Sequence, residues 1–249
     1  MTIYNYENSL RSTECVKYLM QNDVVSGYNT LIVLPIPTSK DGIRLTNTDT
    51  EIKDVLTKIC ANSLVIGYDI PDAWTKDILS RGATVCDSGH DEDFLQENGR
   101  LTAECTMGIL LGSTSRSLGQ MCFGVVGYGR IGKWLLRYLS YFSAKVTVYT
   151  RSIDTRLDLA QSGIFCEDSE NPRVPGDMDV LINTAPKAIF TKESFRENEG
   201  VRIMDLASGN NFPWCERVEK YPSIPAKMLP VSAGAMWGRS VERMLLNNT

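Results

Sequence analysis

The sequence predicts an α/β protein of two lobes: a small N-terminal α/β domain and a doubly wound parallel sheet, with a C-terminal helix packing back on the first lobe. Short apolar runs alternate with segments of helical spacing along the chain. A glycine-rich turn at residues 127–132 stands between a strand-like run and a helical segment. Residues 233–246 again have helical spacing. We expect domain boundaries of 1–104, 105–232 and 233–249.

Composition excludes several classes of protein. Of the 249 residues, 43% are hydrophobic and 22% are charged, with a net charge of −4. These values exclude a disordered chain, a collagen-like repeat and a coiled coil. No polybasic segment recommends nucleic acid or an acidic membrane surface as a partner, and no apolar run approaches the roughly 18 residues that span a bilayer.

Cysteine and histidine usage argues against metal and disulfide chemistry. The seven cysteines include no C-x-x-C pair, and the chain has one histidine. We therefore expect no metal site. Residues 1–7 lack the pattern of a signal peptide, which favours a cytoplasmic location.

The first half reads as alternating strands and helices. No strand is predicted before Tyr28, and the acidic stretch 87–97 is interpreted as a loop or a helix start. The predicted strands are 31–35, 63–67 and 83–85, and the predicted helices are 49–59, 73–79 and the linking helix 101–118.

The second half is clearer. Its predicted strands are 121–126, 145–149, 180–183 and 201–206, with a helix over 133–142. The first of these strands should be central in the sheet.

The glycine-rich turn has the context of a Rossmann dinucleotide-binding fingerprint, because it follows a strand, opens a helix and precedes a second strand. Gly127 allows the tight turn, Gly129 lets the backbone approach a pyrophosphate, and Gly132 lets the helix pack closely on the sheet. The alternative is a glycine turn that binds nothing. The candidate cofactor residues here are Gly127, Tyr128, Gly129, Arg130, Ile131 and Gly132.

The end of the second strand indicates which dinucleotide is bound. An NAD site has Asp or Glu about 20 residues on from the glycines, whereas this chain has Thr150, Arg151 and Ser152. Two hydroxyls and a guanidinium suit a 2′-phosphate. The sequence therefore favours NADP(H) over NAD(H), the alternative being that Arg151 is a solvated loop residue.

Two later strand ends should face the far side of the cofactor, because ligands bind beyond the carboxyl ends of parallel strands. Either segment can also be an ordinary strand-to-helix turn. The candidate residues are Thr184, Ala185, Pro186, Leu206 and Ala207.

Over about residues 29–209 the chain resembles the dipicolinate synthase family, in the two-domain, NADP-dependent component of that enzyme. The resemblance rests on five segments in order: the LP-containing strand end and turn at 34–42, an N-x-x-x-T-x-E segment at 98–104, the glycine loop with Arg151, residues 182–186, and the D-L-A-S segment at 205–208. It implies a cytosolic, NADP-dependent oxidoreductase acting on a small carboxylate-bearing ring or its acyclic relative.

Departures from this family concern the substrate. The family has Pro-Gly-Gly after D-L-A-S, where this chain has Gly209-Asn210-Asn211, and its glycine- and proline-rich C-terminal segment differs at 230–237. Residues 229–249 also resemble the end of methylenetetrahydrofolate dehydrogenases. Their Y-x-x-x-K pair would be Tyr141 and Lys145 here, which is in the wrong domain.

The candidate catalytic residues are Glu104, Thr102 and Ser208. Glu104 can act as an acid or base if burial raises its pKa, and Thr102 can present a hydroxyl at a helix start; the alternative is a helix cap followed by a first-turn carboxylate. His90 lies in the acidic loop, where a surface role is expected. The candidate substrate-binding residues are Pro37, Thr38, Ser39 and Ser232.

Two classes of function remain open: an oxidoreductase that acts on a small carboxylate, and a nucleotide-binding regulatory or partner subunit without its own chemistry. A homodimer is expected from the base rate of two-fold assemblies, and a second subunit is the further possibility.

Overall fold

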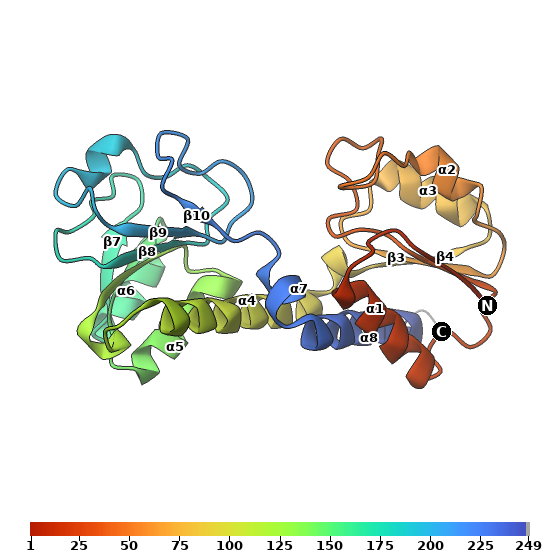
Figure 1. Cartoon of the computed structure of the whole chain (residues 1–249), viewed down its shortest axis with the longest axis horizontal. Helices are drawn as coiled ribbons and strands as arrows, with labels where there is room; N and C mark the ends of the chain where they lie inside the picture. The colour runs from red at the N-terminus through yellow and green to blue at the C-terminus, as the bar shows by residue number, and fades with distance from the viewer. Residues whose placement is uncertain (248–249) are drawn as a thin grey trace. The chain divides into compact units, whose positions relative to one another are not determined.

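The computed structural model describes residues 1–247. It divides into two compact units (Figure 1). The first unit is Met1–Asn98 together with the chain from Pro225 onward, and the second is Gly99–Ile224. Helix α4 (Glu92–Ser113) begins in the first unit and ends in the second.

The first unit is built on a parallel sheet in the order β1-β2-β3-β4. Helices α2 (Ile52–Leu56) and α3 (Asp72–Ser80) cover one face, and α1 (Leu10–Gln21) and α8 (Pro230–Asn247) lie on the other (Figure 1). Covered on both sides, the central strands are apolar throughout, as parallel strands require. The strands are β1 (Thr2–Asn5), β2 (Thr30–Val33), β3 (Ser63–Gly67) and β4 (Thr84–Asp87).

The C-terminal helix packs against α1 within the first unit, which confirms the prediction that it returns to the first lobe. Two glycines of α8 allow the close approach. A Cβ on Gly234 would lie 2.5 Å from the carbonyl oxygen of Arg11, and one on Gly238 would lie 2.4 Å from the Tyr18 ring. The short helix α7 (Ile224–Met228) precedes α8.

The second unit contains a six-stranded parallel sheet in the order β10-β9-β8-β5-β6-β7. This is the strand order of a doubly wound dinucleotide-binding sheet, with its switch point between β5 and β8. The predicted central position of β5 is confirmed. The strands are β5 (Cys122–Val126), β6 (Lys145–Thr150), β7 (Phe165–Asp168), β8 (Val180–Asn183), β9 (Arg202–Asp205) and β10 (Glu219–Lys220).

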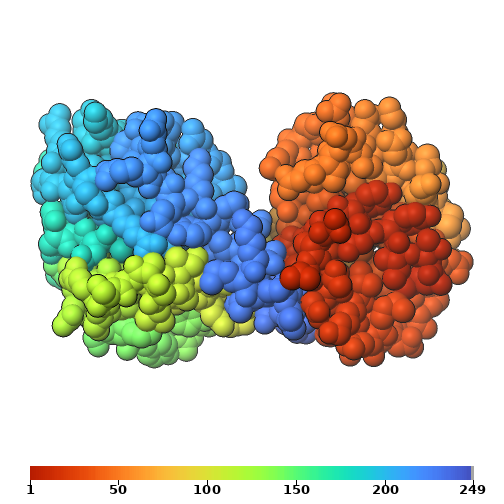
Figure 2. All heavy atoms as spheres, in the orientation of Figure 1, coloured from red at the N-terminus to blue at the C-terminus, as the bar shows by residue number. Residues whose placement is uncertain are grey.

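The two faces of this sheet are covered differently. On one face, α5 (Arg130–Tyr141), α6 (Ile153–Gln161) and the second half of α4 bury an aliphatic core. On the other face, loops and the 3-10 helix Lys192–Phe195 bury an aromatic cluster. In Figure 2 the cyan and blue loops of this unit form a continuous layer beside α4. The aromatic cluster consists of Tyr149, Phe190, Phe195, Phe212 and Trp214.

Two sequence predictions need correction. The segment before Tyr28 forms both β1 and α1, whereas the sequence predicts no strand there. The linking helix starts at Glu92, where the Asp91 carboxylate accepts hydrogen bonds from the backbone N–H groups of Asp93 and Phe94 (3.1 and 3.4 Å). The predicted start at Leu101 is therefore wrong by more than two turns.

A search of the described residues found no helix with the length and apolarity needed to cross a membrane. The same residues contain no cluster of His, Cys, Asp and Glu side chains that could hold a metal ion.

Candidate functional site

The glycine loop joins β5 to α5 at the switch point of the second sheet. Gly127 has a φ of +91°, a conformation that favours glycine. A Cβ on Gly132 would lie 2.1 Å from the Gly127 carbonyl oxygen, so only glycine lets α5 start this close to the strand. The fold itself therefore explains these two glycines.

Gly129 has no such explanation within the described chain. Its φ of −87° suits any residue, and a Cβ there would meet no atom of residues 1–247 within 4 Å. It is the N-cap of α5, and no side chain of the same residues caps this helix end. Open space at an uncapped helix N-terminus is what a phosphate group requires, because the free N–H groups and the helix dipole both attract anions.

A pocket of about 550 Å³ lies between this loop and the end of β6. It brings together the predicted cofactor residues of the adenosine side. Its lining consists of Gly127, Tyr128, Tyr149, Thr150, Arg151, Ser152, Ser169, Glu170, Ala185 and Ile189. Arg130, Ile131, Gly132 and the second loop pair Leu206 and Ala207 lie outside this lining.

Two guanidinium groups stand near the end of β6, and they differ in what they bind. Arg156 donates to the carbonyl oxygens of Thr150 (2.8 Å) and Arg151 (3.2 Å) and pairs with Asp168 (3.1 Å). The Arg151 side chain is exposed and forms no hydrogen bond or ion pair with the described residues. Ser152 caps α6 by accepting from the Thr155 N–H (3.2 Å). Within the described lining of the pocket, the free cation is therefore Arg151.

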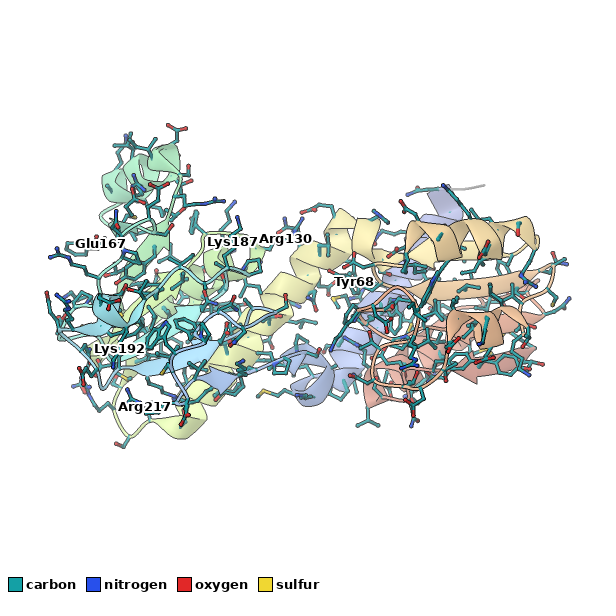
Figure 3. The ribbon with its side chains drawn as sticks, turned by 90° about the horizontal axis from the view of Figure 1, so that it is seen from above. Tyr68, Arg130, Glu167, Lys187, Lys192 and Arg217 are labelled. Atoms are coloured by element: carbon teal, nitrogen blue, oxygen red, sulfur yellow. The ribbon has the colours of Figure 1, made fainter. Side chains whose placement is uncertain are left out.

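Sequence reasoning missed Lys187, which follows the predicted segment Thr184–Pro186. Its side chain is exposed in the loop after β8 and forms no ion pair within residues 1–247 (Figure 3). The signal was present, because a lysine directly after a strand-end segment adds positive charge at the carboxyl edge of the sheet. Thr184 itself donates its hydroxyl to the Val126 carbonyl oxygen (2.8 Å), fixing this loop to β5.

A buried polar network lies at the ends of β8 and β9. Asn183 donates to Asp205 (2.7 Å), and Asn211 donates to both carboxylate oxygens of Asp205 (3.2 and 3.1 Å). These three side chains are 1–3% exposed. Only the fold brings them together, so sequence spacing gave no signal of their contact.

The structure removes the physical basis suggested for two of the catalytic candidates. Glu104 is about half exposed and pairs with Arg100 one turn away (2.9 Å), so the burial that would raise its pKa is absent. Thr102 lies inside α4 rather than at a helix start, and its carbonyl oxygen accepts from the Thr106 hydroxyl (2.8 Å). Ser208 is exposed in the loop after β9.

The predicted substrate residues lie in the first unit. The buried Thr38 hydroxyl accepts from the Tyr68 N–H (3.2 Å), and Ser39 donates to the Arg44 carbonyl oxygen (2.7 Å). Pro37 is half-buried beside them, and Ser232 is exposed in the first turn of α8. Thr38 and Ser39 thus both make hydrogen bonds that fix the local loop.

A carboxylate pair at the ends of β3 and β4 was also missed. Asp87 accepts from the backbone N–H groups of Asp69 (2.9 Å), Ile70 (2.7 Å) and Gly89 (2.8 Å). Burial, and then the charge of Asp87, raises the pKa of Asp69. His90 is exposed, with Nδ1 3.6 Å from Asp87.

The Y-x-x-x-K spacing does not form a site. Tyr141 ends α5 with its side chain exposed, and Lys145 opens β6 and pairs with Asp177 (2.9 Å). Lys145 therefore stands at the amino end of the sheet, whereas the glycine loop is at the carboxyl end.

The strand order, the glycine loop and the adjoining pocket together define a protein with a Rossmann-type dinucleotide-binding unit. Across the whole chain, the fold is that of dipicolinate synthase, as the sequence resemblance implied. The structure of the Bacillus subtilis protein is similar over 99% of this chain and 95% of its own, with a TM-score of 0.74 and 18% identity. For the Bacillus halodurans protein the coverage is 98% and 97%, the TM-score 0.76 and the identity 19%.

Other comparisons agree on the fold and add little on function. A transhydrogenase from Sinorhizobium meliloti is similar over 100% of this chain and 94% of its own, with a TM-score of 0.66 and 15% identity. An 18-hydroxynorfluorocurarine reductase from Strychnos nux-vomica is 37% identical over 73 residues, which is 27% of this chain and only a fifth of that reductase. No protein-family model matches the sequence.

Proposed function

We propose that this chain binds a nicotinamide dinucleotide at the glycine loop and is an oxidoreductase. The observation that carries the proposal is the open space above Gly129 at the uncapped start of α5. Such a cofactor supplies hydride transfer when bound, while the protein contributes binding, orientation and electrostatics. The loop amides would hold the pyrophosphate, and the pocket at the end of β6 would hold the adenosine ribose.

NADP(H) is the preferred cofactor in this proposal. The pocket presents the unpaired Arg151 and the half-buried Thr150 where NAD-binding sheets have a carboxylate. Glu170 also lines the pocket but follows β7, and Asp168 is neutralised by Arg156. A guanidinium without a partner gains most from a 2′-phosphate, because no existing contact has to be broken.

The substrate we propose is a small carboxylate-bearing molecule, because dipicolinate, for which the synthase sharing this fold is named, is such a molecule. Pro37, Thr38, Ser39, Ser208 and Ser232 remain the candidates for holding it. A two-fold homodimer is the expected assembly, which sedimentation at micromolar concentration tests against a 27.8 kDa species.

A second candidate is a dinucleotide-binding subunit without its own chemistry, and the exposure of Glu104 and His90 favours it. The two functions separate in one experiment. NADPH fluorescence is titrated with the protein, and turnover is then measured with a panel of small keto and imino acids. Binding with turnover supports the oxidoreductase, binding without turnover supports the non-catalytic subunit, and absence of binding refutes both.

A further inference from the structure

The ends of β8 and β9 hold a buried carboxylate that no cation of the described chain neutralises. Asp205, the last residue of β9, is 2% exposed. Its oxygens accept hydrogen bonds from Asn183, Asn211 and the Ala207 N–H (3.3 Å), and every one of these groups is a donor. No lysine or arginine within residues 1–247 forms an ion pair with it. A carboxylate that meets only N–H donors is in the arrangement of the ionised group, which can only accept.

This carboxylate connects two loops on the same half of the sheet. Asn183 also donates to the Ala185 carbonyl oxygen (3.0 Å) and accepts from the Ala185 N–H (3.2 Å). Asn211 donates in addition to the Ser208 carbonyl oxygen (3.2 Å). The loops after β8 and β9 are therefore fixed to one negative charge, and losing either amide would leave part of that charge without a partner.

We propose that Asp205 is a positioning residue that also makes the cofactor site prefer the oxidised nicotinamide. The inference rests on the proposed function and deepens it. In a doubly wound sheet the dinucleotide spans the switch point, so the β8–β9 half receives the half of the cofactor that does not contact β6. The oxidised nicotinamide ring is positively charged and the reduced ring is neutral. A fixed negative charge in a water-poor environment therefore stabilises the oxidised form selectively.

Two double variants isolate the charge from the hydrogen bonds. Asp205→Asn alone would turn an NH₂ group toward the Asn211 donor, so it is combined with a change at Asn211 that supplies an acceptor. Asp205→Asn with Asn211→Asp keeps one carboxylate in the network. Asp205→Asn with Asn211→Ser keeps an acceptor but removes the charge. Thermal melting without cofactor checks that both variants fold.

Calorimetric titration with NADP⁺ and NADPH gives the readout. The charge-keeping variant should retain the wild-type ratio of the two dissociation constants within about three-fold. The charge-free variant should lose affinity for NADP⁺ relative to NADPH by about ten-fold, the order of one charge–charge interaction at an effective dielectric constant near 20. Equal losses for both forms would overturn the inference while leaving dinucleotide binding intact. If the wild-type protein binds neither form, the proposed function fails and this inference with it.

Discussion

Replacing Arg151 by alanine should weaken NADPH and leave NADH nearly unchanged. The Arg151 side chain is exposed and has no partner among the described residues, so its removal disturbs no other contact. A hydrogen bond to a charged group contributes roughly 1.5–3 kcal/mol. Because solvent and salt screen an exposed pair, we expect about 1–2 kcal/mol, or roughly a 5- to 30-fold rise in the NADPH dissociation constant.

Arg156→Ala is the matched control, because it removes a neighbouring guanidinium that is already occupied. Arg156 holds the end of β6 through the Thr150 carbonyl oxygen and Asp168. Its loss should weaken NADPH and NADH alike. Thr150→Asp should go further than Arg151→Ala, because a carboxylate there repels the 2′-phosphate and accepts from the ribose hydroxyls; preference should then move toward NADH.

The assay is a titration of both cofactors against wild type and the three variants at low ionic strength. The reasoning is refuted if wild type prefers NADH. It is also refuted if Arg151→Ala weakens the two cofactors by the same factor, since Arg151 would then be only a surface residue.

Three further predictions concern the framework of the fold. Gly132→Ala should reduce the free energy of unfolding by about 1–3 kcal/mol in urea, because the new Cβ would lie 2.1 Å from a loop carbonyl oxygen; an unchanged unfolding midpoint would contradict the close approach of α5 to the glycine loop. Burial raises the pKa of Cys105 to about 11, so iodoacetamide at pH 8 should label the exposed Cys60 well before Cys105, and equal labelling by mass spectrometry would disprove this. Hydrogen bonds from Arg202 hold the pKa of Glu219 below its usual value, so this contribution to stability is present above about pH 4.3 and is lost as pH falls through the lower, folded value; the difference in melting temperature between wild type and Glu219→Gln should shrink from pH 5 to pH 3, and a constant difference would count against it.

Strong local patterns were enough to predict the second sheet. The strand over residues 180–183 was located to the residue, and the glycine loop fell at the predicted switch point. β1 was missed because it is a four-residue edge strand with half-exposed side chains, so it carries no apolar run. The start of α4 was missed because residues 92–100 are mostly polar, and the capping signal at Asp91 lies within an acidic stretch that is equally typical of a loop.

The candidate site was predictable only where one segment defines it. Gly127, Gly129 and Gly132 each have a role that follows from local backbone geometry. The contact of Asp205 with Asn183, by contrast, joins residues 22 apart through the pairing of two strands. Local sequence patterns do not reveal such pairings, because they depend on the order of strands in the sheet.

The central claim is that a dinucleotide occupies the open space above Gly129, and one comparison tests it most directly. Gly129→Val adds atoms only to that space, since no atom of the described residues lies within 4 Å of the new Cβ. Gly112→Val is the matched control, because Gly112 is equally open and lies near the end of α4. Calorimetric titration with NADPH should show wild-type affinity for Gly112→Val and at least about a ten-fold loss for Gly129→Val, with melting temperatures unchanged in the absence of cofactor. Wild-type affinity in Gly129→Val, or no binding by the wild-type protein, would contradict the claim.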